Sequence, residues 1–213
     1  MKTDEFVSLL AAGGGAVESG TTARRHALAI GWGGMGAMLL MAIFLGVRAD
    51  IADAVRLPMF WLKLAFPVCL AGAAFVAATR LARPGARLGQ TPLALVAPIA
   101  VVWAMAAYAL ATAAPDARGA LLLGQTWTVC PGLIALLSLP VLVGTLWAMK
   151  GLAPTQPILA GAAAGLLAGA VATAVYALHC PEMAAPFLAT WYLAGMLIPT
   201  VAGALLGPRL LRW

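Results

Sequence analysis

Long apolar runs alternate with short polar segments along almost the whole chain. A helix that crosses the hydrocarbon core of a bilayer needs about 20 predominantly apolar residues. Six runs meet this requirement, at 27–47, 58–79, 92–114, 127–149, 157–178 and 187–206. The pattern therefore predicts an all-α integral membrane protein, built as a bundle of six transmembrane helices.

The composition agrees with this prediction. Apolar residues make up 63% of the 213 residues, and charged residues only 9%, whereas soluble globular proteins carry about 25% charged residues. A soluble fold of this size lacks the charges to cover its surface, so an ordinary cytosolic enzyme and a disordered chain are both excluded.

The basic residues lie between the apolar runs, where they act as topology signals. One set of alternate segments holds nine of them: Lys2, Arg24, Arg25, Arg80, Arg83, Arg87, Lys150, Arg209 and Arg212. The other set holds three, Arg48, Arg56 and Arg118. Because Lys and Arg favour the cytoplasmic side, we expect both termini in the cytoplasm and the loops 48–57, 115–126 and 179–186 outside. Lys63 lies inside a span, and we expect its ammonium group to extend to the membrane interface.

Residues 1–25 form a separate cytoplasmic segment, followed by the transmembrane domain 26–213. This segment has no early apolar core, so no signal peptide is expected. Thr3 is placed to cap a short helix with acidic residues in its first turn, and Phe6, Leu9 and Leu10 follow at helical spacing. The Gly-rich stretch 13–25 reads as a flexible tether. We expect the amphipathic helix to dock on the membrane surface, on the bundle or on a partner.

Catalytic motifs are missing from the sequence. It contains no HExxH, GxSxG, P-loop or dinucleotide-binding pattern, so we do not expect an enzyme. No Asp or Glu lies within the six runs, and proton-coupled transporters usually need ionisable groups at membrane depth.

The three cysteines divide into two kinds. Cys69 lies inside the second run, where a thiol usually behaves as a small buried apolar group. Cys130 and Cys180 are each followed by proline, and the topology places both at one depth on the outer side. Such a pair can form a disulfide, share a soft metal ion with His179 as a further ligand, or be structural; spacing alone leaves all three open.

Gly161, Gly165 and Gly169 recur at four-residue spacing in the fifth run. A stripe of small residues lets another helix approach closely. We expect it to pack within the bundle, with formation of an oligomer as the alternative.

Several segments together resemble one protein family. They are Lys2-Thr3-Asp4-Glu5, Arg24-Arg25, PMFWLKLAFP (58–67), ALHCPE (177–182) and the tail 186–213. In these segments the chain resembles the NrsF-like family of bacterial six-helix inner-membrane proteins. The resemblance covers nearly the whole chain, and the tail and the His-Cys-Pro-Glu step are its most specific parts.

The resemblance implies an anti-sigma factor. Such a protein holds an extracytoplasmic-function sigma factor at the cytoplasmic face of the membrane and releases it under heavy-metal or oxidative stress, without contacting nucleic acid itself. The family's two outer cysteines match Cys130 and Cys180, so the only cofactor implied is a transient soft metal ion. The resemblance also gives the helix with Phe6, Leu9 and Leu10 a partner, the sigma factor.

Two other functions remain as alternatives from the residues themselves. A small transporter or permease needs a polar path through the bundle, and few polar residues are available for one. A membrane thiol oxidoreductase usually needs a Cys-x-x-Cys pair, which the sequence lacks.

Overall fold

The structure is a computed structural model, and it describes residues 3–13, 21–152 and 154–212. These residues form helices and no strand. The elements are α1 (Thr3–Gly13), α2 (Thr21–Phe44), α3 (Ile51–Ala54), α4 (Pro58–Leu81), α5 (Thr91–Thr112), α6 (Ala117–Leu123), α7 (Cys130–Met149), α8 (Pro157–Tyr176), α9 (Ala185–Phe187), the π-helix η1 (Leu188–Tyr192) and α10 (Leu193–Leu210).

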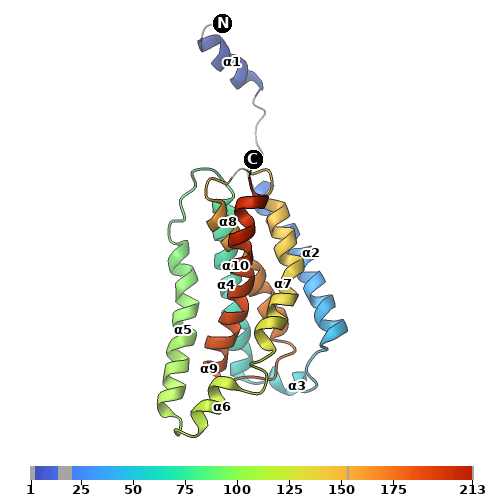
Figure 1. The fold of residues 1–213 in the computed structure, drawn as a ribbon, viewed down its shortest axis with the longest axis vertical. Helices are drawn as coiled ribbons and strands as arrows, with labels where there is room; N and C mark the ends of the chain where they lie inside the picture. The colour runs from blue at the N-terminus through green and yellow to red at the C-terminus, as the bar shows by residue number, and fades with distance from the viewer. Residues whose placement is uncertain (1–2, 14–20, 153, 213) are drawn as a thin grey trace.

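Six helices are long and apolar enough to cross a membrane, which confirms the predicted number of spans. The sixth is the continuous segment Ala185–Leu210, formed by α9, η1 and α10. The long helices run up and down side by side, so that the bundle carries both termini at one end and the short helices α3 and α6 at the other (Figure 1). We call these the terminal end and the far end.

Two predicted boundaries are wrong by a few residues. α2 stops at Phe44 because Leu45 and Gly46 both donate backbone hydrogen bonds to the Met41 carbonyl. Gly46 has a positive φ of 74°, a conformation that glycine adopts without steric cost and that commonly ends helices. The predicted tether is partly helical, since α2 begins at Thr21; residues 14–20 lie outside the described residues.

The glycine stripe of α8 packs against α10 of the same chain. A Cβ atom at Gly161 would overlap the Gly203 carbonyl oxygen, and one at Gly165 would overlap the Pro199 carbonyl oxygen. At Gly169 it would lie 2.9 Å from the Met196 Cα atom. The predicted use within the bundle is confirmed. The alternative, an oligomer formed through these glycines, is wrong because α10 already covers them.

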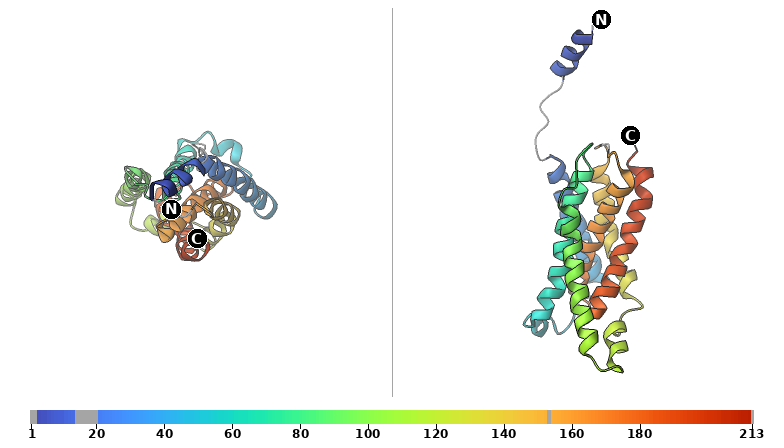
Figure 2. Two further views of the ribbon diagram at one scale, coloured as in Figure 1. Left: turned by 90° about the horizontal axis from the view of Figure 1, so that it is seen from above. Right: turned by 90° about the vertical axis from the view of Figure 1, so that its left-hand side faces the viewer.

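α5 lies at the edge of the bundle. Only 11% of its most apolar window is buried inside the protein, compared with 67% for α8. In Figure 2 the ribbon of α5 stands outside the group formed by α7, α8 and α10. α8 is therefore the central helix, and α5 is the span that the rest of the protein holds least tightly.

Candidate functional site

The turn between α8 and α9 lies at the far end of the bundle and carries the sequence His179-Cys180-Pro181-Glu182. We call residues 179–182 the HCPE turn. Its first two amides, those of His179 and Cys180, donate hydrogen bonds of 2.9 and 3.0 Å to the Tyr176 carbonyl. The chain therefore leaves α8 in a tight turn, which places the Cys180 side chain in the core, where it is fully buried.

Lys63 reaches the HCPE turn from α4, and the prediction that it extends to the membrane interface is wrong. Its side chain is fully buried. Its Nζ donates hydrogen bonds of 2.5 Å to the Cys180 carbonyl and 2.8 Å to the Glu182 carbonyl. The same atom lies 5.7 Å from the centre of the Tyr192 ring, within the range of a cation–π contact. Two carbonyl dipoles and an aromatic face thus replace the water that a lysine would find at the interface.

Arg48, in the connection between α2 and α3, also holds the HCPE turn. Its amide donates to the Leu178 carbonyl at 3.1 Å, and its Nη1 to the Cys180 carbonyl at 3.3 Å. The guanidinium forms a bidentate pair with Asp50, with hydrogen bonds of 2.7 and 2.6 Å. The hydrogen bonds to Asp50 raise the pKa of Arg48, and those from Arg48 lower the pKa of Asp50 below its usual range. Both groups therefore stay charged at neutral pH.

Glu182 fixes the other side of the HCPE turn. Its Oε1 accepts a 2.7 Å hydrogen bond from the Gln125 amide, just after α6. Gly124 has a φ of 56°, and a Cβ atom there would lie 2.7 Å from the Glu182 carboxylate. Glycine at 124 is what allows the carboxylate to approach this closely. The turn is thus held by three segments distant in sequence: the α2–α3 connection, α4 and the α6–α7 connection.

Cys130 and Cys180 are both fully buried and both free thiols. Cys130 is the first residue of α7, and it shares one hydrophobic cluster with Cys180. Both thiols lie in one hydrophobic cluster with Tyr176 and Tyr192, and the Thr126 hydroxyl lies 4.0 Å from the Cys180 sulfur. The two cysteines are therefore buried in one region of the core, with tyrosine and threonine side chains beside them.

Tyr192 belongs to the same cluster and comes from the sixth span. It is the last residue of η1, and its ring lies 6.0 Å from that of Tyr176. Its hydroxyl oxygen is buried and has no hydrogen-bond partner. A π-helix holds one residue more per turn than an α-helix and often marks functional sites. Here η1 ends at Tyr192, which lies in one hydrophobic cluster with the two cysteines.

His179 takes part in the same turn. Its Nδ1 lies 2.9 Å from the Gly46 carbonyl, which can only accept, so Nδ1 carries the donated proton. A metal would then be ligated through Nε2 of the neutral ring, one of the two nitrogens that histidine uses for this purpose. Among the described residues, however, no three His, Cys, Asp or Glu side chains are grouped to hold a metal ion. His179 as a third ligand beside Cys130 and Cys180 stays a prediction.

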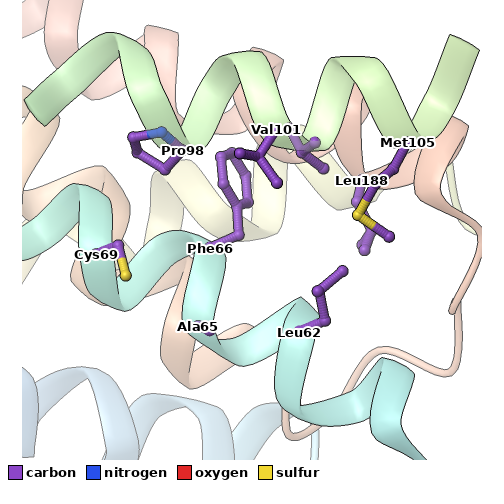
Figure 3. Close-up of a pocket in the computed structure, with 9 residues that line it drawn as sticks. Leu62, Ala65, Phe66, Cys69, Pro98, Val101, Met105 and Leu188 are labelled. Carbon is purple, nitrogen blue, oxygen red and sulfur yellow. The ribbon is translucent and has the colours of Figure 1, made fainter. Parts of the chain in front are cut away.

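Cys69 differs from the other two cysteines and from our expectation. The prediction of a small buried group is wrong, because Cys69 is exposed on α4. It borders a cavity between α4 and α5 (Figure 3). No contact joins it to the HCPE turn in the part of the chain that the structure describes.

The N-terminal helix is present as predicted. α1 has Asp4 and Glu5 in its first turn, and it stands apart from the bundle in Figure 1. Phe6 and Leu9 are 49% and 65% exposed. The side chain of Leu10 lies outside the described residues. The apolar face of α1 thus remains available to a partner.

Comparison with known proteins identifies the family. The family described as negative regulator of sigma F matches residues 10–213. The chain belongs to the NrsF family. It is 55% identical to the "Probable anti-sigma-F factor NrsF" of Azospira oryzae, and 40% identical to the "Anti-sigma-F factor NrsF" of Caulobacter vibrioides. Each comparison covers 100% of both chains. No solved structure matches the chain.

Sequence reasoning alone found only part of the candidate site in this NrsF-family protein. It singled out Cys130, Cys180 and His179 but missed Arg48, and it misplaced Lys63. A lysine in an apolar span is by itself a signal of function, and it would have pointed to α4. The roles of Tyr176 and Tyr192 carried no such signal, because a tyrosine in a span is ordinary.

Proposed function

We propose that this chain is a membrane-bound anti-sigma factor that holds an extracytoplasmic-function sigma factor at the cytoplasmic face and releases it under heavy-metal or oxidative stress. The observation that carries the proposal is membership of the NrsF family over residues 10–213, with two full-length relatives named anti-sigma-F factors. The function proposed is regulation by binding, without catalysis.

The distribution of charge supports a cytoplasmic position for the terminal end. The connections 82–90 and 150–156 lie at that end together with both termini (Figure 1). These segments and the adjoining helix ends carry nine of the thirteen basic residues. Because basic residues favour the inner side of the membrane, α1 would meet a cytosolic partner.

The apolar face of α1 supports a docking role for the N-terminal segment. Phe6 and Leu9 are exposed, and an isolated helix of 11 residues is only marginally stable in water. Binding to the sigma factor would bury Phe6, Leu9 and Leu10 and stabilise the helix. Each such side chain contributes about 1.5–3 kcal/mol on full burial.

The burial of Cys130 and Cys180 in one cluster supports a sensing role at the far end. A thiolate is both the nucleophile in disulfide formation and a soft metal ligand, so one pair can respond to oxidants and to metals. The pair would close either as a disulfide or around a soft cation, with His179 as the predicted further ligand. The Tyr192 hydroxyl belongs to the same cluster and has no hydrogen-bond partner, so it can hydrogen-bond to a bound species.

The bundle offers a route from the cysteines to the terminal end. Cys130 begins α7, and Cys180 follows α8. At the terminal end α7 ends beside Lys150 and α8 begins at Pro157. A bound metal or a disulfide shifts the bundle only if it favours one arrangement of these helices over another. The change would then reach the surface on which the sigma factor is held.

Transport is the less well supported function. The buried hydroxyls of Ser138, Thr145 and Thr173 each bond to a carbonyl of their own helix. These groups are therefore already satisfied, and they do not form a polar path.

Co-purification from membranes tests the proposal. The sigma factor should be recovered with the intact chain and lost from a Leu9→Asp, Leu10→Asp variant, while Val47→Asp, at the far end, serves as the control. Recovery of the sigma factor by the α1 variant would move the docking surface to the loops 80–91 or 150–156.

Reporter fusions test the topology. Fusions after residue 25 and after residue 180 should read opposite sides of the membrane.

A further inference from the structure

A groove separates α5 from α4 along most of their length. Three cavities follow one another in this seam, with volumes of about 500, 200 and 530 Å³. The first and second share Cys69 as a lining residue, and the second and third share Met105. Neighbouring cavities thus share a lining residue, and the series extends from Arg80 at the terminal end to Met59 at the far end, where the third cavity also borders Met183 and Ala185.

The walls of the middle cavity are entirely apolar. In Figure 3, Leu62 and Phe66 of α4 face Pro98, Val101 and Met105 of α5 across the cavity. Aliphatic and aromatic side chains of this kind match the chemistry of a single hydrocarbon chain.

Polar groups gather at one end of the groove only. Arg80 lines the first cavity there, together with Gln90 and Thr91. Its Nη1 donates a 2.5 Å hydrogen bond to the Leu88 carbonyl, and the next residue, Gly89, has a φ of 55°. A Cβ atom at Gly89 would lie 2.9 Å from the Arg80 Nη1. The loop thus holds the guanidinium at the mouth of the groove.

The stretch of the groove from Arg80 to Cys69 matches one leaflet of a bilayer. From Arg80 to Cys69 the helix advances 11 residues, or about 16 Å at the α-helical rise. The hydrocarbon core is about 30 Å thick, so Cys69 lies near its middle when Arg80 lies at its edge. An acyl chain with its headgroup at Arg80 would reach the Cys69 region.

We propose that this groove binds one anionic phospholipid, with its phosphate at Arg80 and one acyl chain between α4 and α5. Arginine recognises phosphate through charge-assisted hydrogen bonds, and the acyl chain packs against Ala73, Val76 and Ala94 of the first cavity. α5 has little protein contact of its own. The lipid supplies the missing packing and fastens α5 to the bundle. This proposal does not depend on the identity of the sigma factor or on the cysteine pair.

Retention of lipid during purification tests the acyl-chain site. The intact protein is extracted in mild detergent, supplied with phosphatidylglycerol and analysed by native mass spectrometry. Gly72 lines the first cavity, and a Cβ atom there meets nothing within 4 Å, so Gly72→Leu fills the groove without a clash. Gly31→Leu is the matched control, because Gly31 is equally open but lies on α2. We expect one retained phosphatidylglycerol in the intact protein and in Gly31→Leu, and loss of it in Gly72→Leu.

A second comparison tests the headgroup. Arg80→Gln should lose the preference for phosphatidylglycerol over phosphatidylcholine with the same acyl chains, and Arg80→Lys should keep it. Arg83→Gln is the control, since Arg83 lies in the same loop but lines a different cavity. If Gly72→Leu does not fold, Ala94→Leu fills the same cavity from α5.

Three results would overturn the proposal. The first is equal lipid retention by Gly72→Leu and Gly31→Leu, and the second is an unchanged headgroup preference in Arg80→Gln. The third is a dimer of the intact chain that Gly72→Leu dissociates, which would assign the groove to a second copy. Cross-linking by a phosphatidylglycerol with a photoreactive acyl chain should label α4 and α5 rather than the lipid-facing surface of α2.

Discussion

The Lys63 ammonium donates a 2.5 Å hydrogen bond to the Cys180 backbone carbonyl, across 117 residues of sequence. Arg48 donates to the same carbonyl at 3.3 Å. Two cations from different segments therefore fix the backbone of Cys180, while its thiol points into the core shared with Cys130. The position of the proposed sensing thiol is thus set by residues outside its own turn.

Replacing Lys63 by methionine should destabilise the protein. The substitution keeps the apolar stem but leaves the Glu182 carbonyl without its donor and the Cys180 carbonyl with only the longer bond from Arg48. A buried polar group that loses its partner costs about 1–3 kcal/mol. Thermal unfolding in detergent measures the effect, and Lys150→Met, at the exposed end of α7, is the control. Equal stability of the two variants would show that the HCPE turn does not depend on Lys63.

Replacing Cys130 and Cys180 by serine, singly and together, should abolish induction of the regulon by cadmium or chromate. Neither a disulfide nor a soft-metal site survives the loss of one thiol. The measurement is reporter expression with and without the stress, and Cys69→Ser should respond as the unmodified protein does. Normal induction in the double variant would make the pair structural.

Gly165→Ala should weaken the packing of α8 against α10. The added methyl group overlaps the Pro199 carbonyl oxygen, which belongs to backbone and cannot move aside easily. Overpacking of this kind costs about 1–3 kcal/mol. Gly31→Ala is the matched control, because its Cβ meets nothing within 4 Å and alanine favours a helix by up to about 1 kcal/mol over glycine. The two variants should therefore shift the unfolding temperature in opposite directions.

The pair of Arg48 and Asp50 should make stability depend on acid pH. The pKa of Asp50 is lowered in the folded protein by its hydrogen bonds from Arg48, so the carboxylate stabilises the fold above its unfolded pKa of about 3.9. This contribution is lost as the pH falls through the lower folded value. The stability difference between the intact protein and Asp50→Asn should be constant near neutral pH and shrink below about pH 4. In Asp53→Asn, whose carboxylate lies 3.9 Å from Arg56 on the exposed surface, we expect a smaller effect because exposed ion pairs are screened by water.

Much of the fold could be predicted, because a membrane span leaves a strong one-dimensional signal. Every backbone group in hydrocarbon must be hydrogen-bonded within the span, so a run of about 20 apolar residues has to be a helix. The ends of the helices were predicted less accurately. For example, α2 ends earlier than predicted because Gly46 adopts a positive φ. Of the candidate site, the sequence pointed to Cys130 and Cys180. Each precedes a proline and the topology places both at one depth, where two thiols can form a disulfide or share a metal ion.

Lys63 and Cys69 show what a one-dimensional pattern leaves undetermined. Both lie on α4 within an apolar run, yet the lysine is buried and the cysteine exposed. Periodicity states which residues share a face, but in a membrane both faces of a helix are apolar, so the pattern does not say which face meets protein and which meets lipid.

The sequence by itself determined the six spans, the basic terminal end and the amphipathic N-terminal helix, because each depends on local composition and spacing. Only the tertiary structure decided that α10 covers the glycines of α8, that Lys63 and Arg48 converge on the Cys180 carbonyl, and that η1 presents Tyr192 to the two thiols. These features require contacts between segments far apart in the chain. Such contacts depend on which helices pack together and at what rotation, which the order of residues along one helix does not specify.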